Sequence, residues 1–150
     1  MPLPPNYRWF DRWVAGSAMP LPEELEDMAI REGIGGLVRL ETTARSKVTP
    51  DQVAAAGMAD LHEPIETNVF VPSLEQARRI LAFVRGIIAS GRTVLVTCGV
   101  GAGRTGTIVA CYFVAQGMPG DEAVRLVGCL QEAAQERFVL RFADLEGGES

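Results

Sequence analysis

The segment TVLVTCGVGAGRTG at residues 93–106 joins a short apolar run to a turn that contains four glycines. Residues 93–97 are apolar or β-branched on both faces, which is typical of a central strand in a parallel sheet. Glycines at this density weaken any regular element, so the backbone of the turn must approach another group closely. The segment therefore predicts a buried strand that ends, at Cys98, in a tight loop built around a ligand.

Three interpretations of this loop follow from its residues. The simplest is a strand-to-helix turn, but a cysteine and an arginine exceed what a turn needs. Residues 101–106 also match the dinucleotide-binding pattern G-x-G-x-x-G, which requires a second strand ending in an acid about 20 residues later. In this chain Asp121 and Glu122 open a helix there instead. A nucleoside-triphosphate loop has glycine where Cys98 stands and lysine where Arg104 stands.

The third interpretation is a phosphate-ester site formed by Cys98 and Arg104, which five residues separate. A loop of this length can direct successive N–H groups at an anion, and the following helix adds its positive end. Arg104 offers a planar fork for two phosphate oxygens. Among such donors a cysteine favours the thiolate form, and Thr105 can donate its hydroxyl to the sulfur. The phosphate cradle would then consist of Gly99, Val100, Gly101, Ala102 and Gly103.

Helix and strand patterns alternate along the rest of the chain. Thr49 with Gln52, and Ser73 with Gln76, match the capping box that starts a helix. The alternation predicts a three-layer α/β fold with a largely parallel sheet, in one domain that comprises residues 1–150. Strands are expected around residues 13–16, 35–40, 59–65 and 93–97, and helices at 20–33, 49–57, 73–91, 104–117, 120–131 and 133–145.

The charge and the cysteines limit the classes of partner and the compartment. A formal net charge of −5 and a pI near 4.9 argue against nucleic acid, which needs a basic binding face. No apolar run approaches the ~20 residues of a membrane span. Residues 1–13 lack the basic segment followed by an apolar segment that is typical of a signal peptide. The three cysteines have no metal-binding spacing and, being odd in number, are expected as reduced thiols. We therefore expect a cytoplasmic protein with neither nucleic acid nor a membrane as partner.

The run CGVGAGRTGTIVACYFV, residues 98–114, resembles the signature of the cysteine-based protein tyrosine phosphatases. It is most similar to the small atypical dual-specificity phosphatases, and the similarity extends to PPNYRWFDRWVAGSAMPLPEEL at residues 4–25 and PSLEQARRI at 72–80. The resemblance spans about residues 4–145. It implies a four- or five-stranded sheet flanked by helices, phosphocysteine chemistry, and no metal or other cofactor.

The resemblance also assigns roles to residues of the loop. Cys98 corresponds to the nucleophile, Arg104 to the phosphate clamp and Thr105 to the partner of the thiolate, while residues 99–103 form the cradle. Thr97 stands where the family usually has a histidine that orders the loop and tunes the thiolate. The amide donors and the helix end remain in place, so a loss of activity does not follow from Thr97.

The general acid of the family is an aspartate on a loop that precedes a proline, and this chain departs from that pattern. Without a gap the position falls on Asn68, and with a one-residue gap it falls on Thr67; neither side chain can donate a proton as a carboxylic acid does. Glu66 is the nearest carboxyl group and the candidate replacement, although a solvated loop acid is the simpler interpretation. Glu63 is the next nearest, and Asp60 is expected in a strand.

Other polar residues have a structural and a functional interpretation. His62 is expected to be a hydrogen-bonded strand residue rather than a catalytic one, and as the only histidine it cannot form a multi-histidine metal site. Gln135 is similar to a glutamine that family members carry on a late helix near the site, but a core-edge or solvent position fits equally well. Cys111 and Cys129 are expected to pack inside.

These features predict a phosphatase that hydrolyses phosphate monoesters of a phosphorylated protein or a small molecule through a phosphocysteine intermediate. Without its acid the enzyme should prefer aryl phosphates such as phosphotyrosine, because a phenolate leaves more easily than a serine or threonine alkoxide. Phosphate and vanadate should inhibit by occupying the loop. One alternative is a phosphatase for a small or lipid phosphate, although Val100 and Ala102 lack the charge that polyphosphorylated inositides favour. The other is a phosphate-binding module with weak catalysis.

Overall fold

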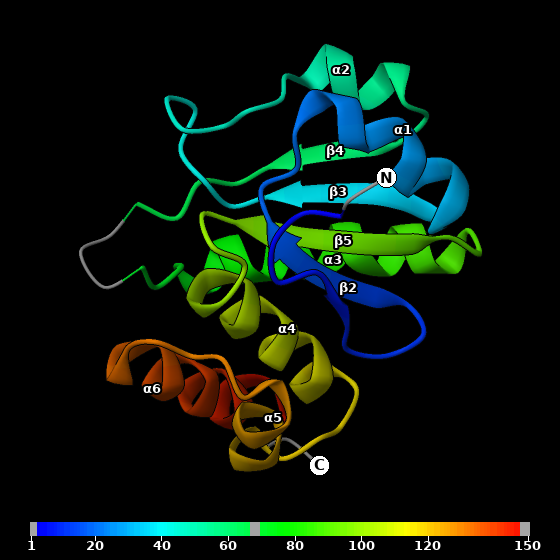
Figure 1. The fold of residues 1–150 in the computed structure, drawn as a ribbon. Helices are drawn as coiled ribbons and strands as arrows, with labels where there is room; N and C mark the ends of the chain where they lie inside the picture. Colours follow the sequence, from blue (N-terminus) through cyan, green and yellow to red (C-terminus); the bar gives the residue numbers. More distant parts are fainter. Residues whose placement is uncertain (1–2, 67–69, 148–150) are drawn as a thin grey trace.

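The computed structural model describes residues 3–66 and 70–147, and through them runs a five-stranded sheet in the order β1-β2-β5-β3-β4 (Figure 1). β1 pairs antiparallel with β2, and the other strands are parallel. The prediction of a largely parallel α/β sheet is confirmed, whereas the short edge strand β1 has no counterpart in the sequence prediction. The strands are β1 Arg8–Trp9, β2 Val14–Ala18, β3 Ile34–Arg39, β4 Ala59–His62 and β5 Thr93–Cys98.

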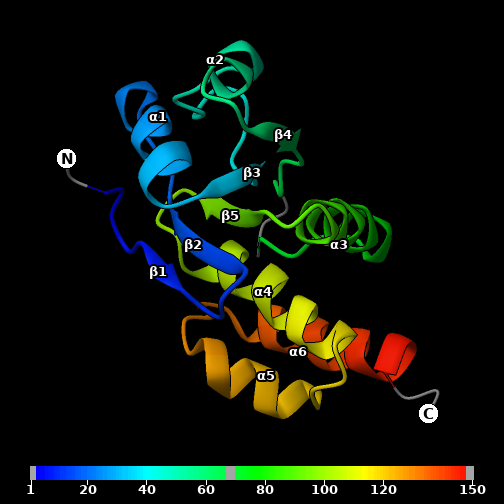
Figure 2. The ribbon, with the colours of Figure 1, turned by 90° about the vertical axis from the view of Figure 1, so that its right-hand side faces the viewer.

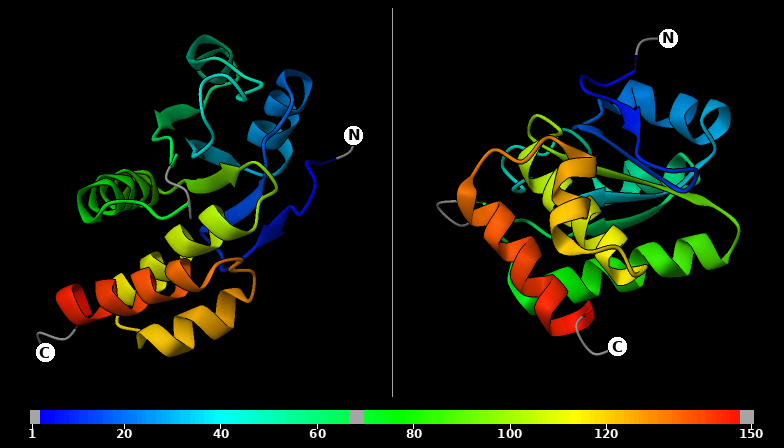
Figure 3. Two further views of the ribbon diagram at one scale, coloured as in Figure 1. Left: turned by 90° about the vertical axis from the view of Figure 1, so that its left-hand side faces the viewer. Right: turned by 90° about the horizontal axis from the view of Figure 1, so that it is seen from below.

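Helices cover both faces of the sheet (Figure 2, Figure 3). α1 and α2 lie on one face, and α3 and α4 lie on the other, so the sheet is the middle of three layers. α5 and α6 pack against α4 rather than against the sheet. The helices are α1 Pro22–Arg31, α2 Pro50–Ala55, α3 Leu74–Ala89, α4 Gly103–Ala115, α5 Gly120–Val127 and α6 Ala133–Phe142, which a π-helical turn at Ala143–Gly147 extends.

Local hydrogen bonds set the helix ends. Thr49 Oγ1 accepts from the Gln52 N–H at 3.2 Å and Gln52 Oε1 accepts from the Thr49 N–H at 2.9 Å, which completes the predicted capping box of α2. α5 ends at Val127, short of the predicted residue 131. The cause is Gly128, which adopts φ +64 and closes the helix with a left-handed cap.

Apolar side chains form one core on each face of the sheet. The smaller core packs Leu37 of β3 with Leu25 and Met28 of α1. In the larger core α4 is buried along almost its whole length, because it lies between the sheet and the pair α5 and α6. Cys111 of this helix is buried as predicted, whereas Cys129 is only half-buried. None of the helices in the described ranges is both long enough and apolar enough to cross a bilayer.

The carboxyl ends of β2, β3 and β5 meet at one edge of the sheet. Ala18 of β2 pairs in register with Cys98, and Arg39 of β3 pairs with Thr97. The helix that follows β5 lies on the opposite face from the helices that follow β2 and β3. Ligands of open α/β sheets bind where the connections diverge in this way. The loop after Cys98 therefore starts at the crevice that the topology creates.

Candidate active site

The loop that follows β5 makes close backbone contacts with β2. Cys98 is the last residue of β5 and is 1% exposed, and α4 starts at Gly103. Gly101 has φ +80, and a Cβ there would lie 2.3 Å from the carbonyl carbon of Ser17 and 2.4 Å from the nitrogen of Ala18. No larger residue fits at this position without moving the backbone. The glycine therefore allows the loop to lie close to β2, a close approach of the kind that the many glycines of the turn predict.

A cup of about 220 Å³ opens beside this loop. Cys98 and Arg104 both line it, so the structure brings the predicted nucleophile and the predicted phosphate clamp together. Gly99 and Val100 of the predicted cradle line it as well. The N-terminal end of α4 adds positive potential next to the loop. Side chains from other segments complete the cup: Glu41, Arg45, Phe70, Gln131 and Gln135.

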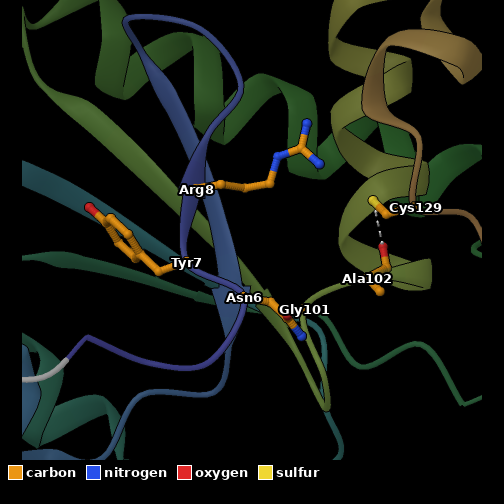
Figure 4. Close-up of a pocket in the computed structure, with 6 residues that line it drawn as sticks. All are labelled: Asn6, Tyr7, Arg8, Gly101, Ala102 and Cys129. Atoms are coloured by element: carbon orange, nitrogen blue, oxygen red, sulfur yellow. Dashed lines mark hydrogen bonds between the residues drawn. The ribbon is translucent and has the colours of Figure 1, made fainter.

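Gly101 and Ala102, the next residues of the predicted cradle, line a second pocket of about 230 Å³ (Figure 4). Asn6 Nδ2 donates to the carbonyl oxygen of Val100 at 2.6 Å, and Cys129 Sγ donates to that of Ala102 at 3.4 Å. Two carbonyl groups of the loop are therefore bonded outside the cup. The remaining lining residues of this pocket are Tyr7 and Arg8.

Three residues fix the guanidinium of Arg104. Nη1 donates to Glu41 Oε1 at 3.1 Å and to the Ile65 carbonyl oxygen at 3.4 Å, and Nη2 donates to Glu41 Oε2 at 2.9 Å. The guanidinium carbon lies 4.6 Å from the centre of the Phe70 ring, a cation–π contact. The side chains of Arg104 and Glu41 are 11% and 4% exposed, so the ion pair is buried.

Glu41 occupies only the end of this guanidinium. Both hydrogens of Nη1 and one of Nη2 are used, and in the described part of the chain the Nε–H and the second Nη2–H of Arg104 have no partner. These two N–H groups are parallel and form a side-on fork that matches two oxygens of a phosphate. Arg104 can therefore clamp an anion while it keeps its bond to Glu41.

Glu41 is not evident from the sequence, because its position at the site depends on which strands are neighbours. It follows β3 after Leu40, at the edge where Cys98 ends β5. Burial alone would raise the pKa of Glu41, but hydrogen bonds from Arg104 and from the Thr42 N–H outweigh burial and hold the pKa below its ordinary value. The signal that could have found it is an acid directly after the predicted strand at residues 35–40.

The hydroxyl of Thr105 is not bonded to the sulfur in this structure. Thr105 is fully buried in the first turn of α4, and its Oγ1 donates to the carbonyl oxygen of Val96 at 3.4 Å. A carbonyl oxygen is a stronger acceptor than a thiol sulfur, so it takes the buried hydroxyl in place of Cys98. A role for Thr105 at the thiolate requires rotation of its side chain.

The expected general-acid position, Asn68 or Thr67, lies outside the described residues. Glu66 is exposed and does not line the cup, as expected of a solvated loop acid. Glu63 accepts from Arg79 at 2.9 and 3.1 Å, and this hydrogen bonding lowers the pKa of Glu63 despite partial burial. A carboxylate held in its ionised form is a poor general acid.

Asp60 and His62, in β4, have structural partners. Asp60 accepts from Nε and Nη2 of Arg39 at 2.7 and 2.8 Å, a buried pair that joins β3 to β4. His62 Nε2 lies 2.7 Å from the backbone carbonyl oxygen of Glu41, as expected of a hydrogen-bonded strand residue. His62 therefore supports the segment that carries Glu41.

Gln135 lies in the wall of the cup and is 1% exposed. Its Oε1 accepts from the N–H groups of Gln131 and Glu132 at 2.9 and 3.1 Å, and its Nε2 donates to the Phe70 carbonyl oxygen at 3.3 Å. A Cβ on Gly103 would lie 2.8 Å from the same Nε2. The sequence leaves three positions open for Gln135: near the site, at the edge of the core, or in solvent. The structure excludes the solvent position.

A family model described as polymorphic toxin system, DSP-PTPase phosphatase, matches residues 14–118, a range that contains Cys98 and Arg104. The phosphatidylglycerophosphate phosphatase PTPMT2 of Arabidopsis thaliana is 26% identical over 115 residues, which are 75% of this chain and 50% of that protein. This chain therefore spans half the length of that relative.

Solved structures share the fold over nearly the whole chain. The active form of Tk-PTP has a TM-score of 0.83 and 27% sequence identity, with 94% of this chain and 97% of that chain covered. PTPMT1 in complex with PI(5)P has a TM-score of 0.89 and 20% identity, with 95% and 97% covered. The second likeness concerns the fold alone.

Proposed function

This chain belongs to the DSP-PTPase phosphatase family, and we propose that it hydrolyses phosphate monoesters through a phosphocysteine intermediate, with a preference for aryl esters such as phosphotyrosine. One observation carries the proposal: Cys98 and Arg104 line the same cup, and the bonds of Arg104 to Glu41 use only the end of its guanidinium. Binding of phosphate does not need a thiol, so a cysteine in this place supports catalysis over a mere binding module.

The proposed reaction has two displacements at phosphorus. The Cys98 thiolate attacks the phosphorus atom, the S–P bond forms, and the P–O bond to the ester breaks as the leaving oxygen takes a proton from solvent. Water then attacks the phosphocysteine and gives its proton to solvent, the S–P bond breaks, and inorganic phosphate leaves with the thiolate restored. Arg104 and the N–H groups of residues 99–103 stabilise the charge on the phosphoryl oxygens, and Thr105, after rotation, the sulfur.

The preference for aryl esters rests on two carboxylates, Glu41 in the wall of the cup and Glu63 on the segment before the expected acid position. Glu41 and Glu63 are both hydrogen-bonded to arginines in their ionised forms, so neither is available to protonate a leaving group. A phenolate leaves without such help more readily than an alkoxide. Phe70, 42% exposed beside Arg104, offers an apolar surface to the ring of an aryl ester. Within this proposal Asn68 marks the acid position, and Glu66 is the nearest carboxyl that a loop movement could bring in.

A lipid phosphate is the second candidate substrate, because the relative PTPMT2 is named for phosphatidylglycerophosphate. A groove of about 350 Å³ on α6 combines the apolar ring of Phe138 with the cations Arg137 and Arg141. Ala134 of the groove directly precedes Gln135 of the cup in α6. An anionic lipid has the apolar and charged parts that such a groove would accept.

We also propose a cytoplasmic location and a phosphorylated protein or small phosphate ester as the partner. Cys98, Cys111 and Cys129 are free thiols, which suits a reducing compartment.

Turnover of p-nitrophenyl phosphate, with and without vanadate, tests whether the chain is a phosphatase. We expect vanadate-sensitive release of nitrophenol by the wild type and none by Cys98→Ser, which should still bind phosphate. Phosphate binding without any turnover by the wild type would favour the binding module instead.

Substrate choice is tested by comparing a phosphotyrosine peptide, the matching phosphoserine peptide and vesicles that contain phosphatidylglycerophosphate. Loss of general acid catalysis lowers the rate by about 10²–10⁴-fold. The rate on the phosphoserine peptide should fall more than the rate on the phosphotyrosine peptide. Equal rates on the two peptides would require a hidden acid. Faster turnover of the lipid would replace the aryl ester with the second candidate.

A further inference from the structure

An anion-binding loop works only while its N–H groups, and not its carbonyl groups, face the anion. In a trans peptide the C=O and the N–H point in opposite directions, so a flip of one peptide plane replaces a donor with a repelling oxygen. Glycine-rich loops allow such flips at low steric cost. Residues 99–103 contain three glycines, so a contact from outside the loop can favour the binding conformation.

Asn6 makes the contact that can select it. Its Nδ2 donates to the carbonyl oxygen of Val100 at 2.6 Å, across 94 positions of the chain. Figure 4 shows Asn6 beside Gly101, in the pocket that the N-terminal segment forms with the loop. Because this bond holds the Val100 carbonyl outside the cup, the N–H of Gly101 in the same peptide points the opposite way. The Asn6 side chain is therefore bonded to the peptide that carries one of the predicted donors.

The Val100 carbonyl depends on this contact more than the Ala102 carbonyl does. The Ala102 oxygen accepts from the Gly106 N–H at 2.6 Å in the first turn of α4, in addition to Cys129 Sγ. Helix formation alone therefore orients that peptide. Val100 precedes the helix, and Asn6 supplies the hydrogen bond that its carbonyl makes in the described part of the chain.

The backbone around Asn6 is built to hold this side chain in place. Asn6 has φ +61, a left-handed conformation that asparagine tolerates better than most residues and that persists where the surroundings impose it. The adjacent Pro5 carbonyl accepts from the Ala18 N–H at 2.8 Å. Ser17 and Ala18 are also the residues against which Gly101 packs. The N-terminal segment and the loop are thus anchored on the same end of β2.

We propose that Asn6 is a positioning residue, which keeps the Val100–Gly101 peptide in the orientation that binds the phosphoryl group. This inference rests on the proposed function, since it concerns the same anion site. Asn6 itself does not line the cup and acts through the loop.

The test compares Asn6→Gly with Arg8→Ala. Glycine keeps the left-handed backbone and removes only the side-chain donor. Arg8 Nη1 donates to the Val127 carbonyl oxygen at 3.1 Å, so its loss loosens the same N-terminal segment without removing a bond to the loop. Affinity for inorganic phosphate is measured by calorimetry in the Cys98→Ser background, and kcat/KM for p-nitrophenyl phosphate in the native-cysteine background.

A single hydrogen bond changes an equilibrium about three- to tenfold, so we expect Asn6→Gly to lower phosphate affinity and kcat/KM by about that factor. The unfolding temperature without phosphate should stay close to that of the wild type, and Arg8→Ala should lower phosphate affinity less than Asn6→Gly does. Wild-type affinity in Asn6→Gly, or an equal loss in Arg8→Ala, would overturn the role of Asn6 and leave the proposed function intact. A wild type that binds no phosphate and turns over no ester would overturn both.

Discussion

Glu41 holds Arg104 by the end of its guanidinium, with distances of 3.1 and 2.9 Å, and leaves the Nε edge of Arg104 without a hydrogen-bond partner among the described residues. The arrangement orders the clamp before any anion arrives, because the buried carboxylate and the ring of Phe70 limit its rotation. A preorganised cation needs little rearrangement when charge develops on the phosphoryl oxygens. Glu41 thereby links the end of β3 to the first turn of α4.

Replacement of Glu41 by glutamine should weaken both the fold and the reaction. Loss of one partner from a buried ion pair typically costs about 3–5 kcal/mol of unfolding free energy. A misplaced clamp can cost up to about 10²-fold, so we expect kcat/KM to fall by about 10- to 100-fold in Glu41→Gln. Urea unfolding and turnover of p-nitrophenyl phosphate measure the two effects.

The matched control is Asp60→Asn, which breaks the other buried arginine pair, to Arg39, away from the cup. It should lower stability by a similar amount and change kcat/KM much less. An Asp60→Asn variant as impaired in catalysis as Glu41→Gln would show that the loss reflects stability alone.

The stabilisation by Glu41 should depend on pH in a defined direction. Its pKa is held below the ordinary value of 4.5, so the folded state favours the ionised form more than the unfolded state does. The contribution is then fully present above the unfolded pKa and is lost as the pH falls through the lower, folded pKa. The difference in unfolding free energy between wild type and Glu41→Gln should shrink in acid. A difference that stays constant from neutral pH to well below 4.5 would contradict this sign.

Asn68→Asp should restore an acid if position 68 is the acid position. General acid catalysis contributes about 10²–10⁴-fold, and a poor leaving group gains most. We therefore expect a larger increase in kcat/KM for alkyl phosphates than for aryl phosphates. Asn68→Ser, which changes the side chain without adding a carboxyl, should leave the ratio unchanged. An identical ratio in Asn68→Asp would place the acid position elsewhere, and a loss of activity in Glu66→Gln would point to Glu66.

Because Gly101 is closely packed, its substitution should lower the free energy of unfolding by more than the cost of the left-handed conformation alone. Gly33 has a similar φ of +74 but open space around it. Gly33→Ala should therefore lower the free energy of unfolding only by the cost of a left-handed alanine, about 1–2 kcal/mol. At Gly101 an added Cβ also meets the backbone of Ser17 at 2.3 Å. Gly101→Ala should therefore be less stable than Gly33→Ala and should bind phosphate more weakly. Equal stability and unchanged phosphate affinity would show that the loop moves freely.

Features that depend on adjacent residues are predictable from the sequence. The strand before Cys98, the loop and the helix after it form one continuous run, so their order and the spacing to Arg104 reveal the site. Glu41 and Asn6 escape such a prediction because they reach the loop from 63 and 94 residues away. Their positions follow from the insertion of β5 between β2 and β3, which the order of elements along the chain does not reveal.

Side-chain orientation is a second reason why the structure differs from the sequence prediction. Thr105 stands at the expected position, but whether its hydroxyl bonds to sulfur or to the Val96 carbonyl depends on the packing of α4 against the sheet. The end of α5 likewise depends on the left-handed conformation of Gly128. The local sequence pattern assigns such residues to a helix or a strand, but it does not determine which neighbouring residue they contact.

The covalent intermediate on Cys98 can be observed directly. Rapid-quench mass spectrometry during turnover of p-nitrophenyl phosphate should find one added phosphoryl group on the peptide that contains Cys98, and none in Cys98→Ser. Glu41 and Glu63 are engaged by arginines and cannot readily activate water, so the intermediate should accumulate and nitrophenol release should begin with a burst. Sustained turnover by the wild type, with a linear onset and no phosphoryl group on Cys98, would contradict nucleophilic catalysis by this residue.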